Sequence, residues 1–308
     1  MKKLQKKLFF FWGDGMSETG VDKTSLFKAN TPYINRLMPR SRMGLYLPIL
    51  RNGTLHPHTD TVIPYMYFVD PEEFVGRASL ELLDFGIPPA PNNWVASFRV
   101  SIPHESHLVP GLTDQNRFLG WVNLLSNSSF QISPYSAKKN ILVTQSKEKD
   151  SLENTIFRIQ HALKVYDIII SDVNIFQYKK PSISDQLNLC FVGWSRGSLR
   201  GSFRLIGASV NEYTPPLFDF QAYKQDMLEN IKNKLSALIE QYDIFVFFVK
   251  ETDTASHLNR QDLKIQAIET LDWVIGQSLP YIPEDSTIVI LADHPTNLGS
   301  PSSIMAPT

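Results

Sequence analysis

Three segments of this sequence stay apolar for the length of a β-strand, and each leads toward an acidic residue. Residues 7–12, 242–249 and 286–292 are rich in Phe, Val, Ile and Leu, and amphipathic helices are expected between them, most clearly over 221–241 and 260–277. Continuous apolar strands joined by helices are typical of parallel sheets that are covered on both faces. The sequence therefore predicts an α/β fold with a largely parallel central sheet.

The acidic residues after these strands are candidate metal ligands. In open α/β sheets, ligand-binding residues lie just beyond the carboxyl ends of the strands, where Asp14, Asp253 and Asp293 are found. His257 follows Asp253 by one helical turn and His294 follows Asp293 directly. Each feature alone has another explanation, as a turn former or a surface ion pair. Together, these oxygen and nitrogen donors favour a divalent-cation site.

The rest of the chain alternates between shorter helical and extended patterns. Thr31 and Pro32 are a typical N-cap and first-turn pair. Further helices are expected over 31–38, 77–85, 113–125 and 151–164, and strands over 94–100 and 140–145 and near 165–170 and 187–193.

Composition excludes several classes of protein. The formal net charge of -1 over 308 residues gives no electrostatic reason to expect binding to nucleic acid or to an anionic membrane. The single Cys190 excludes an internal disulfide framework and fits a reducing compartment, so we expect a cytoplasmic protein. No window reaches the roughly 18 apolar residues of a membrane span. The basic start, MKKLQKKLFFFW, lacks the apolar length of a signal peptide and is interpreted as the first core strand.

Two local motifs bear on phosphate chemistry. Gly13 and Gly15 begin a dinucleotide-binding pattern, but the third glycine would fall at Glu18, which excludes that site. Thr59 lies at the start of an expected helix, 60–67, where free N–H groups favour an anion. Its hydroxyl is either a simple N-cap or, beside divalent cations, a nucleophile toward phosphorus.

A series of motifs runs along the chain in a specific order: GDGM at 13–16, TPYINRL at 31–37, PHTD at 57–60, VDPEEFVGRASLELL at 69–83, SFR at 97–99, NLCFVGWSR at 188–196, DTASH at 253–257 and ADH at 292–294. In order and approximate spacing, these motifs resemble the alkaline phosphatase superfamily, and within it the archaeal-type cofactor-independent (2,3-bisphosphoglycerate-independent) phosphoglycerate mutases.

The resemblance implies a phosphoryl-transfer enzyme with two divalent metal ions, Mn²⁺ or Zn²⁺, with Mg²⁺ as a further option. It would interconvert 2-phosphoglycerate and 3-phosphoglycerate through a phosphothreonine. By this resemblance one metal is held by Asp14, Asp293 and His294 and touched by the nucleophile Thr59. The remaining pair, Asp253 and His257, would hold the other metal.

The resemblance also implies a substrate site and two domains. Three arginines would clamp the phosphate or carboxylate of a small phosphorylated substrate: Arg77, Arg99 and Arg196. Residues 1–100 and 203–308 would form the alkaline phosphatase-like core, and 101–202 an inserted α+β cap that excludes water from the reaction.

Three departures from the family pattern keep other functions open. The mutase nucleophile is serine, whereas Thr59 is of the kind used in hydrolytic branches. The cap motif HPVN is replaced by SDVN at 171–174, and Ser303 aligns where the family has a third histidine on the second metal. A phosphatase or phosphodiesterase of the same superfamily, or a catalytically weakened binding or regulatory relative, is therefore the alternative.

Overall fold

The structure is a computed structural model, in which the chain divides into two compact units. Unit 1 comprises residues 1–72, 183–195 and 206–308, and unit 2 comprises 73–182 and 196–205. Within them the structure describes residues 6–19, 23–44, 75–101, 115–126, 128–136, 139–166, 168–182, 191–192, 197–211 and 216–299. Each unit has its own sheet.

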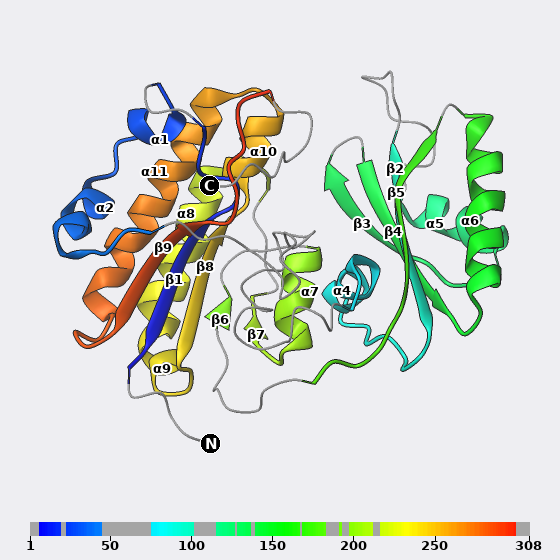
Figure 1. Cartoon of the computed structure of the whole chain (residues 1–308), viewed down its shortest axis with the longest axis horizontal. Helices are drawn as coiled ribbons and strands as arrows, with labels where there is room; N and C mark the ends of the chain where they lie inside the picture. Colours follow the sequence, from blue (N-terminus) through cyan, green and yellow to red (C-terminus); the bar gives the residue numbers. More distant parts are fainter. Residues whose placement is uncertain are drawn as a thin grey trace. The chain divides into compact units, whose positions relative to one another are not determined.

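Unit 1 is built on a parallel sheet, which confirms the predicted fold class. Its described strands lie in the order β7-β6-β8-β1-β9, and all the pairs are parallel (Figure 1). Their bounds are β1 Leu8–Gly13, β6 Phe191–Val192, β7 Ser209–Val210, β8 Ile244–Val249 and β9 Thr287–Ala292. The three apolar segments identified in the sequence are thus the neighbouring strands β8, β1 and β9.

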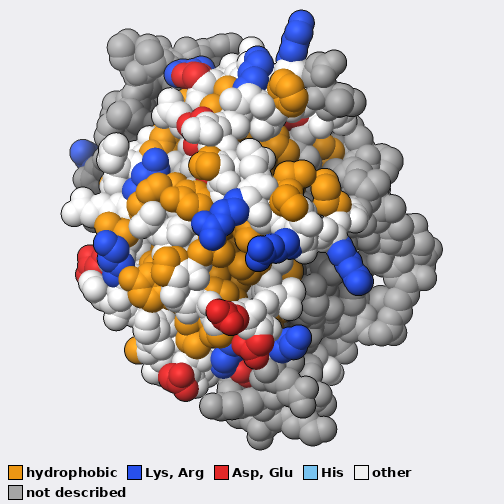
Figure 2. All heavy atoms as spheres, turned by 90° about the vertical axis from the view of Figure 1, so that its left-hand side faces the viewer, with side chains coloured by type: hydrophobic (Ala, Val, Ile, Leu, Met, Phe, Trp, Pro, Cys, Tyr) orange, Lys and Arg blue, Asp and Glu red, His pale blue; other side chains and the backbone are white. Residues whose placement is uncertain are grey.

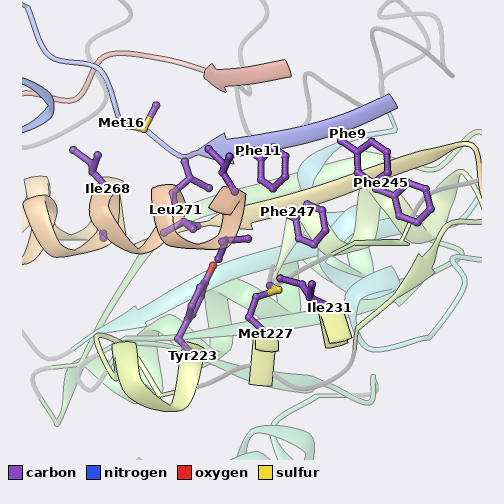
Figure 3. Packing of buried hydrophobic residues seen from close by; sticks show 14 of the residues in the cluster. Phe9, Phe11, Met16, Tyr223, Met227, Ile231, Phe245, Phe247, Ile268 and Leu271 are labelled. Carbon is purple, nitrogen blue, oxygen red and sulfur yellow. The ribbon is translucent and has the colours of Figure 1, made fainter. Parts of the chain in front are cut away.

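Aromatic packing joins the two central strands of unit 1. Phe9 stacks on Phe245 with ring centroids 4.7 Å apart, and Phe11 stacks on Phe247 at 4.9 Å. Helical side chains cover this face of the sheet (Figure 3). They come from α8 Phe220–Glu229, η4 Asn230–Leu235, α9 Ser236–Ile239 and α11 Gln261–Ser278. Trp12, on the opposite face of β1, is also fully buried, so both faces of the strand are covered as its composition predicts.

The other helices of unit 1 are short. They are α1 Ser25–Lys28, α2 Pro32–Leu37, η1 Met38–Arg40, α10 Glu251–His257 and η5 Leu279–Tyr281. Thr31 is the N-cap residue of α2 as predicted, but its side chain makes no capping hydrogen bond. Asp272 of α11 accepts the N–H groups of Tyr33 and Ile34 instead, so the start of α2 is stabilised by a residue distant in sequence.

Unit 2 contains an antiparallel sheet in the order β3-β4-β2-β5. These strands span Gln131–Ser136, Lys139–Ser146, Trp94–Ser101 and Ile169–Gln177, respectively. The helices of this unit are α4 Arg77–Asp84, α5 Gln115–Leu124, α6 Lys149–Lys164 and α7 Ser198–Leu205. Strand β2 pairs along its length with β4 and β5, so it belongs to unit 2. The division into a core of residues 1–100 and 203–308 and a cap of residues 101–202 stays a prediction.

Several elements differ from the sequence expectations. The helix expected over 221–241 changes to π-helical geometry at η4. The strand expected near 165–170 begins at Ile169 as β5, and β3, α7 and β7 were not expected. Residues 286–292 were predicted to be fully buried, but β9 is half-buried because it is the edge strand of the described sheet.

The side of unit 1 that carries α2, α11 and β9 is shown in space-filling form in Figure 2. Hydrophobic side chains there lie in patches between Lys and Arg side chains. Among the described residues, no helix combines the length and apolar character needed to cross a bilayer.

Candidate metal centre

The carboxyl ends of β1 and β9 bring the first two candidate ligands together. Gly13, the last residue of β1, is paired with Ala292 of β9, so the residues that follow these strands start side by side. Asp14 and Asp293 are those residues. The Asp14 N–H donates to Val249 O at the end of β8 (3.0 Å), and this bond ties the turn to the third strand.

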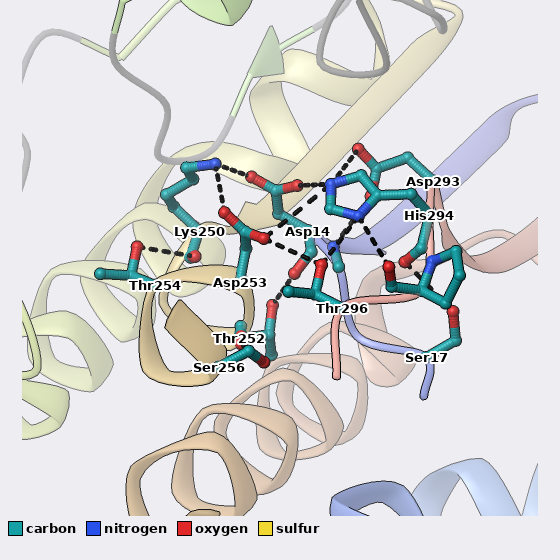
Figure 4. Close-up of polar contacts among 12 residues, drawn as sticks. Asp14, Ser17, Lys250, Thr252, Asp253, Thr254, Ser256, Asp293, His294 and Thr296 are labelled. Atoms are coloured by element: carbon teal, nitrogen blue, oxygen red, sulfur yellow. Dashed lines mark hydrogen bonds and ion pairs between the residues drawn. The ribbon is translucent and has the colours of Figure 1, made fainter. Parts of the chain in front are cut away.

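Asp14, Asp293 and His294 form a buried cluster with the donor atoms of a metal site. Each offers one ligand atom, and these atoms all lie within 4.8 Å of one another. Nε2 of His294 is 3.2 Å from Asp14 Oδ1 and 3.7 Å from Asp293 Oδ2 (Figure 4). The side chains are 2%, 1% and 7% exposed for Asp14, Asp293 and His294, respectively.

The electrostatics of this cluster favour the binding of a cation. Burial, followed by repulsion from Asp14, raises the pKa of Asp293 to about 7. Burial would lower the pKa of His294, but its hydrogen bond to Asp14 and the surrounding carboxylates raise that pKa to about 9. Oδ2 of Asp293 is buried and has no hydrogen-bond partner among the described residues. A divalent cation would satisfy this oxygen and offset the carboxylate repulsion, so the residues present fit a metal ion.

Asp253 and His257 lie on α10 and meet as their spacing predicts. His257 Nε2 is 3.3 Å from Asp253 Oδ1, and that oxygen is 4.0 Å from His294 Nε2. Burial alone would raise the pKa of Asp253, but the Lys250 ammonium and His257 outweigh burial and lower it. The two side chains therefore offer one oxygen and one nitrogen donor beside the first cluster.

Two residues of the site were not identified from the sequence. Lys250 lies directly after β8, and its Nζ pairs with Asp14 and with Asp253 Oδ2, the latter at 3.2 Å. The sequence could have indicated Lys250, because it directly follows an apolar strand, and the same position identified Asp14 as a candidate. Thr296 carried no such signal, since it reaches the site only through the turn that follows His294.

Thr296 orients the imidazole of His294. Its hydroxyl donates to Asp253 Oδ1 (3.0 Å) and lies 2.8 Å from Nδ1 of His294. A hydroxyl has one proton to donate, so with that proton on Asp253 it accepts the Nδ1–H of His294. This arrangement leaves Nε2 as the ligand atom toward Asp14 and Asp293.

The side chains of Thr296 and Asp253 lie so close to residue 15 that only a glycine fits there. Its φ is +55°, and a Cβ there would lie 2.4 Å from Thr296 Oγ1 and 2.9 Å from Asp253 Oδ1. Its N–H donates to Asp293 Oδ1 (3.0 Å). The glycine thus lets the backbone itself form one wall of the cluster.

The other predicted site residues are not brought to this cluster by the described contacts. Thr59 and Arg196 lie outside the described residues. Arg77 and Arg99 belong to unit 2 and pair there with carboxylates, Nε of Arg77 with Glu81 at 3.0 Å and Arg99 with Asp172 at 2.8 Å. Their assignment to a substrate site stays a prediction.

Comparison with known proteins bears on what this cluster is. Residues 209–299, which include Lys250, Asp253, His257, Asp293 and His294, match the Metalloenzyme superfamily. A 2,3-bisphosphoglycerate-independent phosphoglycerate mutase of Ignicoccus hospitalis is 22% identical, over 95% of this chain and 85% of its own length. The predicted family resemblance is confirmed.

Two further matches concern a shorter segment of the sequence and the fold, respectively. A mutase of the same name from Thermococcus kodakarensis is 37% identical over 99 residues, 32% of this chain and 23% of that protein. The structure of the PH0037 protein from Pyrococcus horikoshii superposes with a TM-score of 0.69 at 20% identity, over 96% of this chain and 84% of that one. The second match bears out the fold class. The family match supports a metal-dependent enzyme that binds divalent ions.

Proposed function

We propose that this chain is a metal-dependent phosphoryl-transfer enzyme that interconverts 2-phosphoglycerate and 3-phosphoglycerate through a phosphothreonine at Thr59. The observation that carries the proposal is the buried cluster of Asp14, Asp293 and His294 at two strand ends. Similarity to phosphoglycerate mutases over 95% of the chain supports the choice of substrate. We place the reaction in the cytoplasm on the basis of the single Cys190.

In this proposal Asp14, Asp293 and His294 would hold one divalent ion, and Asp253 and His257 would hold a second ion beside it. When bound, the ions favour the ionised hydroxyl of the nucleophile and offset charge on the phosphoryl group. The burial of Asp14, Asp293 and His294 limits the access of water to the first of these ions.

The chain's own residues carry the transfer in two steps. The Thr59 oxygen bonds to phosphorus as the bond to the glycerate oxygen breaks; the threonine loses its proton and the leaving oxygen gains one. The other hydroxyl of glycerate then attacks the phosphothreonine, which restores the Thr59 hydroxyl. The Lys250 ammonium, already paired with Asp14 and Asp253, offsets negative charge near the phosphate.

Arginines of unit 2 are proposed to hold the anionic ends of the substrate. Arg77, Arg99 and Arg196 offer planar, permanently charged donors that suit a phosphate and a carboxylate. Arg99 pairs with Asp172, a residue of the SDVN segment that departs from the family pattern. A substrate anion at Arg99 would compete with this carboxylate.

Hydrolysis is the second candidate, favoured by Thr59 in place of serine and by the altered segment around Asp172. In this case water takes the place of the second glycerate hydroxyl and releases free phosphate. A catalytically weakened binding relative is the third candidate, favoured by Ser303 at the position of a family histidine.

One series of measurements distinguishes the mutase, the hydrolase and the weakened binding relative. Purified protein is analysed for metal, loaded with Mn²⁺ or Zn²⁺ and given 3-phosphoglycerate, and products are followed by ³¹P NMR. The mutase predicts 2-phosphoglycerate, the hydrolase predicts free phosphate, and both predict that Thr59→Ala abolishes turnover while metal binding persists. Bound metal without turnover of any phosphorylated substrate would leave only the weakened relative, and a protein that takes up no metal would refute the enzyme.

A further inference from the structure

A lysine is fully enclosed beneath the metal centre. Lys264 is in the first turns of α11 and is 0% exposed. Its Nζ donates to Gly15 O at 3.0 Å and to Thr296 O at 2.8 Å, and it lies 3.4 Å from Glu18 Oε1. An ammonium has three N–H donors, and this one faces an acceptor for each.

We propose that Lys264 is a positioning residue for the metal centre, which holds the loop after β1 and the loop after β9 in register. The proposal rests on the proposed function, because it concerns the ligands that this function requires. Gly15 follows the ligand Asp14, and Thr296 follows the ligand His294 by two residues. One ammonium therefore ties together the two backbone segments that carry the cluster.

The cost of enclosing this charge supports a specific role. Burial lowers the pKa of Lys264, and the nearby charge of Glu18 opposes that effect. A methionine or leucine would fill the same space beneath the loops without a desolvation penalty. An apolar residue could not donate hydrogen bonds to the carbonyl groups of Gly15 and Thr296, which belong to separate loops.

Two partners of the Lys264 ammonium, Thr296 and Glu18, make further contacts of their own. Thr296 orients His294 through Nδ1 and also donates to Asp253, so a shift of the Thr296 backbone displaces two candidate ligands. Glu18 accepts from the backbone N–H and from the hydroxyl of Ser25, the latter at 2.8 Å. The acidic partner of Lys264 is thus itself fixed at the start of α1. Such outer contacts typically contribute about 10-fold to 100-fold to metal affinity.

The test compares Lys264→Met with Lys28→Met. Lys28 is an exposed lysine of α1 whose Nζ donates to Gln261 at the start of the same helix α11 (2.7 Å), so it serves as a matched control away from the ligands. Each protein is stripped of metal and titrated with Co²⁺, with affinity taken from calorimetry and ligand geometry from the visible spectrum. Circular dichroism in EDTA reports whether each variant is folded.

We expect Lys264→Met to be folded in EDTA but to bind Co²⁺ about 10-fold to 100-fold more weakly, with an altered visible spectrum. Lys28→Met should match the wild type in both respects. A folded Lys264→Met with wild-type affinity and spectrum would overturn the proposal. If Lys264→Met does not fold, Glu18→Gln decides: a weaker affinity supports the proposal, and an unchanged one overturns it.

The same titration separates this proposal from the proposed function. A wild-type protein that binds Co²⁺ but transfers no phosphoryl group would refute the function alone. A wild-type protein that binds no Co²⁺ would refute the metal centre, and with it both proposals.

Discussion

At the scale of single residues, Gly15 gives the sharpest prediction. A Cβ at this position would meet Thr296, Asp253 and His294 at less than 3.0 Å, and φ there is positive. We expect Gly15→Ala to reduce Mn²⁺ or Zn²⁺ affinity by at least about 10-fold, because every atom that must move belongs to a candidate ligand or to Thr296, which orients one. Calorimetric titration measures the loss, and unchanged affinity would contradict the geometry of the cluster.

Protonation of the same cluster predicts how metal binding depends on pH. The raised pKa values of about 9 for His294 and about 7 for Asp293 mean that the metal-free protein holds protons near neutrality which a metal ion must displace. Affinity should therefore rise as pH increases from about 6 to 9. More than about one proton should be released per metal at pH 7, measured by calorimetry in buffers of different ionisation enthalpy. Affinity that stays constant over this range would contradict these protonation states.

At the scale of elements, the crossing of α4 and α7 depends on one glycine. A Cβ on Gly201 of α7 would lie 1.7 Å from the carbonyl oxygen of Leu80 in α4. Gly201→Ala should lower the free energy of unfolding by about 1–3 kcal/mol, because the helices must move apart. Gly120 of α5 has nothing within 4 Å of such a Cβ, so Gly120→Ala should raise stability by about 0.5–1 kcal/mol. Urea unfolding compares the two, and equal effects would contradict the close crossing.

Helices and strands were predictable from the sequence where the local pattern of apolar residues matches their burial in the fold. Strands β1 and β8 are apolar throughout and lie at the centre of a parallel sheet, so their composition indicated both their type and the chemistry at their ends. By contrast, α7 contains Gly201 and β3 contains a proline, residues that local propensity disfavours in a helix and in a strand. Tertiary contacts support both elements, because α7 packs closely on α4 and β3 pairs with β4. Thr296 was missed for the same reason, because its role comes from a turn that tertiary packing folds back onto His294.

At the scale of the whole molecule, the two units predict unequal responses to metal removal. All the candidate ligands that the structure describes, and Lys264 beneath them, belong to unit 1, whereas unit 2 has a separate core around Phe98, Phe130 and Leu142. A ligand stabilises the folded unit that binds it in proportion to the logarithm of its concentration over Kd, about 2.7 kcal/mol at 100 times Kd. We therefore expect EDTA to increase amide hydrogen exchange in β1, β9 and α10 and to leave β2 and β4 unchanged.

Hydrogen exchange followed by mass spectrometry, with and without saturating Mn²⁺, measures both units in one sample. His294→Ala is the control, because it should give the metal-free exchange pattern in unit 1 even when Mn²⁺ is present. Equal protection of β2 and β1 by the metal would mean that the units unfold together, and no protection of either would contradict the metal centre. Protection confined to unit 1 is the expected result, because binding energy is transmitted through packed contacts, and the candidate ligands lie on the turns and the helix that follow β1, β8 and β9.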